Sequence, residues 1–144
     1  MGKGTKKSAG VIKAPAVRVD QRHLTFSLQY LQLDHPKFRI SDCPRDFFEA
    51  FFRDIDYFQK FTVDAFTWST PLEHRHPIPF KETTEPNGFP SIDPADDELW
   101  TDDAWQFGLR ETSGTPSKTW RVHGFLAAEV FYVVWLDPLH KLHS

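Results

Sequence analysis

Four polar side chains on two neighbouring predicted strands have the types needed for acid–base chemistry. Gln106 and Arg110 occupy one strand, and Arg121 and His123 occupy the other. Both pairs alternate with apolar residues, so each pair is expected on the less apolar face of its strand. If the strands keep the register that this alternation implies, the four side chains lie within reach of one another. Arginine stabilises charge on phosphorus and histidine transfers a proton near neutral pH, so the pattern predicts acid–base catalysis beside a phosphodiester.

The C-terminal segment adds further groups of the same kind. It reads Asp137-Pro138-Leu139-His140-Lys141-Leu142-His143 and directly follows a strongly apolar strand. Two imidazoles and one ammonium group are therefore expected at the end of the central strand, close to the first four polar residues.

A structural interpretation of the same residues stays open. His123 is then a partly buried histidine that hydrogen-bonds a neighbour, and Arg121 pairs with Glu111 or Glu129 across strands. Both interpretations agree with the alternation, because a period of two does not distinguish a binding face from an ion-paired face.

Metal, redox and nucleophile motifs give weaker signals. His74 and His76 could join His140 or His143 around a metal ion, but the spacing does not require it, and no metal or cofactor is predicted. The chain has one cysteine, Cys43, which excludes an internal disulfide. Glycine-rich phosphate loops and G-x-S-x-G are absent from the sequence.

The positions of these groups depend on a small set of predicted elements. A strand over 23–33 is followed by an amphipathic helix of about 17 residues, whose apolar residues recur at spacings of three and four. Ser41 or Asp42 is expected to cap this helix, and Thr62 is expected to cap a short second helix. A proline-rich loop over 71–103 leads to a strand over 104–110 and a hairpin over 118–138, in which both strands are rich in aromatic and β-branched residues.

This order predicts a two-layer α+β fold with an antiparallel sheet of about four strands, connected β-α-α-β-β-β. Both helices are expected on one face, with the other face half open. Residues 1–22 are predicted to be a flexible basic tail of charge +5, and 23–144 a single domain of charge −8. No apolar run is long enough to span a bilayer, so no membrane contact and a cytoplasmic location are expected.

The C-terminal pattern resembles a group of small, largely uncharacterised bacterial proteins. It consists of Arg121-x-His123-Gly124-Phe125, the strand over 130–136 and Asp137-Pro138-x-His140, together with Trp105-Gln106-Phe107. Over about residues 23–143 the order of elements is also similar to the RelE/ParE superfamily of toxin–antitoxin toxins. That likeness implies a RelE-like fold, with a phosphate-binding arginine at Arg121 and an acid–base group at His140 or His143. The acidic body and the loop over 71–103 depart from the superfamily pattern.

Two function classes follow from the residues and the resemblance. The first is a toxin that acts as a metal-independent endoribonuclease, with RNA and a cognate antitoxin as partners. Its predicted catalytic residues are Arg121, His123 and His140. Its predicted substrate-binding residues are Gln106, Arg110, Lys141 and His143. The second class is a non-enzymatic interaction module that uses the open sheet face or the acidic loop 93–103, so the sequence does not settle whether the protein is an enzyme.

Overall fold

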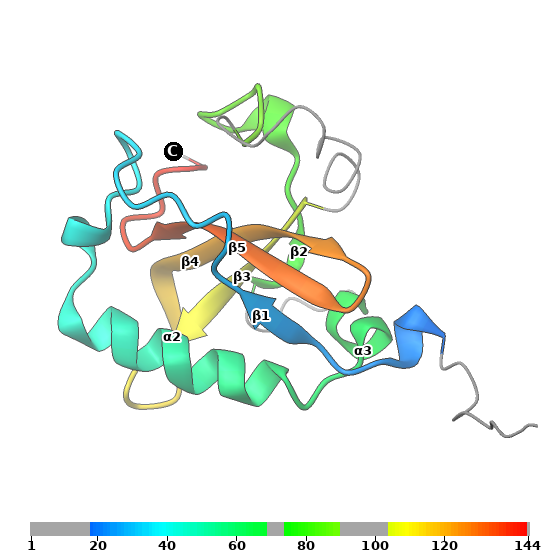
Figure 1. Ribbon diagram of the computed structural model, residues 1–144. Coiled ribbons are helices and arrows are strands. Elements are labelled where there is room, and N and C mark those ends of the chain that lie inside the picture. Colours follow the sequence, from blue (N-terminus) through cyan, green and yellow to red (C-terminus); the bar gives the residue numbers. More distant parts are fainter. Residues whose placement is uncertain (1–17, 69–73, 90–103, 144) are drawn as a thin grey trace, which may run out of the picture.

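The computed structural model describes residues 18–68, 74–89 and 104–143. The elements within these ranges form a sheet with helices on one side (Figure 1). The strands are β1 (Thr25–Ser27), β2 (His76–Pro77), β3 (Ala104–Arg110), β4 (Pro116–Ala127) and β5 (Val130–Asp137). The helices are α2 (Arg45–Phe58) and α3 (Val63–Thr67), and the 3₁₀ turns are η1 (Val19–Gln21), η2 (Ile40–Asp42) and η4 (Phe80–Glu82).

The sheet is mixed and has five strands in the order β1-β5-β4-β3-β2. β1 runs parallel to β5, and the other neighbouring strands are antiparallel. The α+β class is therefore confirmed, but the predicted sheet of about four antiparallel strands is wrong in two respects. A short edge strand forms inside the predicted loop, and the first strand pairs with the last one in parallel. A period-two pattern carries no information about strand direction, so it could not reveal the parallel pairing.

α2 forms because its apolar residues make a single stripe along a helix. Its buried residues are Phe47, Ala50, Phe51, Asp54 and Phe58. The helix has 14 residues, and its N-cap position is Pro44, with no side-chain cap. The expected caps Ser41 and Asp42 instead belong to the turn η2. The cap of α3 is as predicted, because Thr62 Oγ1 accepts a hydrogen bond from the amide of Ala65 at 3.1 Å.

The helices pack on one face of the sheet through an aromatic core. Phe58, at the end of α2, makes edge contacts with Phe66 of α3 and Phe107 of β3, with ring centroids 5.3 and 5.1 Å apart. Strand residues on the same side include Val122, Leu126, Phe131 and Val133. Burial of this much aromatic surface fixes the helices on the sheet and defines its helix face.

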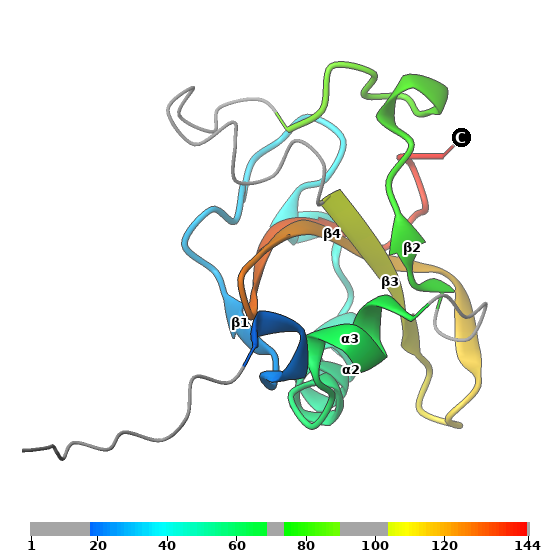
Figure 2. The ribbon, with the colours of Figure 1, turned by 90° about the vertical axis from the view of Figure 1, so that its right-hand side faces the viewer.

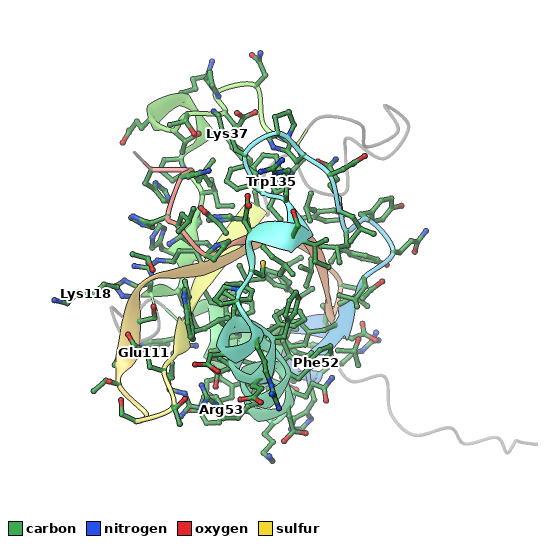
Figure 3. All side chains as sticks on the ribbon, turned by 90° about the vertical axis from the view of Figure 1, so that its left-hand side faces the viewer. Lys37, Phe52, Arg53, Glu111, Lys118 and Trp135 are labelled. Atoms are coloured by element: carbon green, nitrogen blue, oxygen red, sulfur yellow. The ribbon has the colours of Figure 1, made fainter. Side chains whose placement is uncertain are left out.

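The opposite face of the sheet is also covered, so the prediction of a half-open face is wrong. A second buried cluster lies there, formed by Phe38, Ile78, Phe89, Ala104, Phe125, Val134, Trp135 and Leu142. Figure 3 shows Trp135 and Lys37 on this side and Phe52 and Arg53 on the helix side. The covering residues come from loops that show no strand or helix periodicity, which is why the sequence did not indicate them.

Hydrogen bonds join these loops to the C-terminal segment. The amide of Thr84 donates to the carbonyl of Leu142 and its hydroxyl to that of Lys141, both at 2.8 Å. The ammonium of Lys37 donates to the carbonyl of Thr84 at 2.7 Å and pairs with Glu85 at 2.5 Å. The segments over 74–89 and 138–143 lie side by side as a result (Figure 2).

The part of the predicted tail that the structure describes lies against the domain. Residues 18–22 contain η1, and the carbonyl of Arg22 accepts a hydrogen bond from the amide of Val63 at 2.9 Å. Residues 1–17 and the acidic segment 93–103 lie outside the described residues. Among the described residues, no helix has the length and apolar character needed to cross a membrane.

Candidate functional site

A β-bulge in β5 determines which side chains meet on the face opposite the helices. In the β4–β5 pairing His123 lies opposite Trp135, whereas the next residue, Gly124, lies opposite Val133. Val134 is the extra residue, and beyond it the alternation of β5 is reversed. Asp137 therefore shares a face with His123, whereas strict alternation would have placed it on the helix face.

Asp137 is fully buried and holds three hydrogen-bond donors. Its Oδ2 lies 3.1 Å from His123 Nε2 and accepts from the amide of Leu142 at 3.1 Å. Its Oδ1 accepts from the amide of Lys141 at 2.9 Å. Burial opposes ionisation, but these donors and the nearby His123 hold the pKa of Asp137 below its ordinary value. One carboxylate thus both orients the imidazole of His123 and anchors the segment that carries the C-terminal histidines.

His123 is held neutral in one tautomer. It is fully buried, and burial is the main reason that its pKa is lowered. Because the carboxylate of Asp137 only accepts, Nε2 carries the hydrogen and Nδ1 keeps its lone pair. Nδ1 has no hydrogen-bond partner among the described residues. His123 is therefore a buried histidine that hydrogen-bonds a neighbour, as the structural interpretation expects, although its ring is fully rather than partly enclosed.

Two C-terminal histidines lie next to this pair. The ring centroids of His140 and His143 are 5.4 Å apart, and those of His123 and His143 are 6.2 Å apart. Burial, followed by the neighbouring histidines, lowers the pKa of His143 to about 4. The pKa of His140 is also lowered, first by burial and then by the charge of Arg121. Both rings are only partly buried, so a ligand can contact them, whereas His123 is enclosed.

β2 brings the two histidines of the predicted loop to the same place. His76 lies opposite Gln106 in the sheet, and its ring centroid is 6.1 Å from that of His143. The pKa of His74 is lowered by burial and then by the charges of Arg121 and His140. The four histidines of positions 74, 76, 140 and 143, whose proximity the sequence left open, therefore form one cluster with His123.

Two members of this histidine cluster have a left-handed backbone. The φ angle is 52° at His74 and 58° at His140. For a residue with a Cβ this conformation costs roughly 1–2 kcal/mol. Backbone strain of this kind concentrates at functional sites, where the surrounding structure holds it in place.

The structure encloses Arg121, for which a phosphate-binding role is predicted. Its side chain is only 4% exposed, and its guanidinium donates to the carbonyls of Ser117, Lys118 and Trp120 at 3.0 to 3.2 Å. It pairs with neither Glu111 nor Glu129. Because the guanidinium is enclosed, a phosphate could reach it only if the surrounding segments moved, so its contribution in this structure is a buried positive charge behind the histidines. Alanine at this position also removes buried hydrogen bonds, so it is not a neutral surface substitution.

Arg110, a predicted substrate-binding residue, lies on the helix side. The β3–β4 register shifts between Gly108 and Arg110. The Arg110 side chain lies against α2, where Nη2 and Nε donate to Asp54 Oδ1 at 2.7 and 3.1 Å. Its guanidinium also lies 4.6 Å from the ring centroid of Tyr57. The sheet therefore separates Arg110 from the histidine cluster.

We expect Arg110→Met to lower the free energy of unfolding by about 2 kcal/mol, because the buried carboxylate of Asp54 loses the two hydrogen bonds from the Arg110 guanidinium and keeps only Arg53 as a charged partner among the described residues. Urea denaturation at pH 7 measures the change. Arg45→Met is the matched control, since Arg45 makes an exposed ion pair with Glu49 on the same helix. Equal stabilities of the two variants would contradict a structural role for Arg110.

The remaining predicted substrate-binding residues both lie at the histidine cluster. Gln106 is buried in the middle of the histidine cluster, and Lys141 is partly exposed beside it.

Cys43 has a pKa raised to about 12, mainly by burial, so it is not a thiolate at neutral pH. Among residues 18–68, 74–89 and 104–143, no group of three or more His, Cys, Asp or Glu side chains has an arrangement that could hold a metal ion.

Asp137 is the residue of this site that the sequence interpretation missed. Its only signal was its position, directly after the apolar strand and before a proline. The bulge that directs the Asp137 side chain at His123 cannot be recognised in the sequence, because the strand is apolar throughout. Comparisons of the chain with protein-family models, curated proteins and solved structures gave no match.

Proposed function

We propose that this protein is an endoribonuclease that cleaves RNA by acid–base catalysis without a metal ion. The observation that carries the proposal is the pair of partly buried imidazoles, His140 and His143, with ring centroids 5.4 Å apart. A single phosphodiester can contact two imidazoles at this separation. Asp137 supports the arrangement, because it binds the backbone between the two histidines.

The reaction assigned to the pair is transfer within the RNA chain. His143 removes the proton of the ribose 2′-hydroxyl, and the 2′-oxygen forms a bond to the adjacent phosphorus. The bond from phosphorus to the 5′-oxygen breaks, and His140 gives that oxygen a proton. The products are a 2′,3′-cyclic phosphate and a 5′-hydroxyl, so no water, metal or oxidant is consumed. The negative charge of a bound phosphodiester favours the protonated form of His140, which offsets its lowered pKa.

Two cations support binding of an anionic substrate at this place. Lys141 is partly exposed and lies between the two histidines in the chain. Arg121 adds a buried positive charge that acts over a distance and needs no contact with phosphate. This division of roles differs from the sequence prediction, in which Arg121 bound the phosphate.

The biological role that we attach to this activity is that of a toxin with a cognate antitoxin. This part of the proposal comes from the similar order of elements in the RelE/ParE superfamily. The alternative role as an interaction module relied in part on an open sheet face, but that face is covered. Its other surface, the acidic loop 93–103, lies outside the described residues.

The test is cleavage of a fluorescent RNA oligonucleotide by the purified full chain in excess EDTA. We expect cleavage that depends on the 2′-hydroxyl, so that a DNA copy of the oligonucleotide stays intact. His140→Ala and His143→Ala should each lower the rate about 10²–10⁴-fold, as for loss of a general acid or base. His23→Ala is the matched control, because His23 is an exposed histidine outside the cluster.

Two results would refute this function. If the RNA stays intact in all conditions, the protein is not an endoribonuclease. If EDTA abolishes cleavage, the mechanism is not metal-independent. Growth arrest of a bacterial host on induction, relieved by His143→Ala and not by His23→Ala, would support the toxin role.

A further inference from the structure

Gln106 connects two histidine residues through a side-chain amide with a defined orientation. It is 2% exposed and lies in β3, opposite His76 on one side and His123 on the other. Its Nε2 donates to the carbonyl of His74 at 3.4 Å, and its Oε1 lies 2.5 Å from His143 Nε2. The amide thus spans the centre of the histidine cluster.

The chemistry of these groups determines the direction of each hydrogen bond. A backbone carbonyl only accepts, so the group that faces His74 must be the NH₂ of Gln106. The oxygen of the amide then faces His143, and oxygen also only accepts. His143 Nε2 must therefore carry the hydrogen, which leaves the lone pair of the neutral ring on Nδ1.

We propose that Gln106 is a positioning residue that makes Nδ1 of His143 the proton acceptor of the reaction. The proposal rests on the proposed function, since it names the base and the group that selects its tautomer. Gln106 touches no reacting atom in this scheme. It acts through His143, and His74 acts through Gln106.

A neutral partner suits the charges that surround His143. The titratable and charged groups around it are His74, His76, Arg121, His123, Asp137, His140 and Lys141. Asp137 is the one carboxylate in this set, and it is occupied by three donors. An amide accepts the hydrogen bond without adding negative charge, so the ring stays neutral and keeps a free lone pair. A general base must be unprotonated, so it works only at a pH above its own pKa. The low pKa of His143 therefore keeps it active as a base down to mildly acidic pH.

A carboxylate at position 106 separates this role from simple packing. Gln106→Glu keeps the size and the acceptor but adds a negative charge, which favours the imidazolium form of His143. The titration midpoint of His143 should rise by about 1 to 3 pH units. The acid limb of the cleavage profile should move up with it, so that the variant is weak at pH 5.5 and recovers towards pH 8.

The experiment is a pH titration of the full chain by ¹⁵N NMR, in which the ring nitrogen shifts report both tautomer and midpoint. Wild-type His143 should be the Nε2–H tautomer, with a midpoint well below that of an ordinary histidine. Gln106→Met, which has similar size but no acceptor, should lose the tautomer preference. Gln59→Glu, an exposed substitution at the end of α2, should leave both quantities unchanged.

The outcomes test the role of Gln106 and the endoribonuclease activity separately. An Nδ1–H tautomer in the wild type, or an unchanged midpoint in a folded Gln106→Glu variant, overturns the role of Gln106. If Gln106→Glu does not fold, the tautomer in the wild type and in Gln106→Met still decides the question. The expected tautomer in a protein that fails to cleave RNA supports the orientation by Gln106 and refutes the endoribonuclease.

Discussion

Replacement of Asp137 by asparagine should lower RNA cleavage about 10²–10⁴-fold, the usual effect of disrupting acid–base machinery. It should also lower the free energy of unfolding by about 3 kcal/mol, because a buried hydrogen-bonded charge is removed. The carboxylate accepts from His123 and from the amides of Lys141 and Leu142. An asparagine must direct its NH₂ at one of these donors, so the orientation of His123 or the path of the C-terminal segment is lost.

The pH dependence gives a second, independent readout for this variant. The pKa of Asp137 is held below its ordinary value. A carboxyl with a lowered pKa stabilises the fold above its unfolded-state pKa of about 4, and this stabilisation disappears as the pH falls through the lower folded-state value. The stability difference between wild type and Asp137→Asn should therefore be constant near neutral pH and shrink on the acid side.

Urea denaturation between pH 3 and pH 7 tests this expectation. The control is Asp56→Asn, which removes an exposed carboxylate of α2 that pairs with Lys60 just beyond the helix. It should change neither stability nor cleavage measurably. A stability of Asp137→Asn equal to that of the control would mean that the Asp137 hydrogen bonds do not stabilise the fold.

Gly124→Ala should destabilise the fold much more than Gly114→Ala. A Cβ at position 124 would overlap the backbone oxygen of Tyr132 and lie 2.6 Å from Cε1 of Phe131. The bulge in β5 lies beside this point, where Gly124 pairs with Val133. Neither the backbone nor a fully buried ring can move away, so we expect a loss of more than about 3 kcal/mol.

Gly114→Ala is the comparison that separates crowding from backbone strain. Gly114 has a φ of 90° in the β3–β4 turn, but nothing lies within 4 Å of its would-be Cβ. Strain alone should cost about 1 kcal/mol there. Thermal denaturation followed by circular dichroism ranks the two variants. A smaller loss for Gly124→Ala than for Gly114→Ala would show that the two strands are not held at this separation.

The sequence predicted those parts of the fold in which neighbours in the chain decide the outcome. The alternation of β4 placed Val122 and Leu126 on the helix face and Arg121 and His123 on the other, as observed. The stripe of phenylalanines predicted α2, and the structure confirms it. These are local effects, because the period of a helix or strand is written into consecutive residues.

Register irregularities lie beside the two largest errors at the site. The extra residue in β5 brings Asp137 to His123, and Arg110, next to the register shift between β3 and β4, binds Asp54 of α2. One extra residue in a strand reverses every side chain beyond it. The cause of each bulge lies in the pairing of two strands, so inspection of one strand cannot reveal it.

The sequence by itself determined which chemical groups are available: five histidines, Gln106, Arg121 and Lys141, supplied by strands, by the loop over 71–103 and by the C-terminal segment. Only the tertiary structure decided what these groups do. It enclosed Arg121 and His123, left His140 and His143 partly exposed, and directed the amide of Gln106. Burial and hydrogen-bond direction depend on contacts between segments far apart in the chain, and those contacts set pKa values and tautomers.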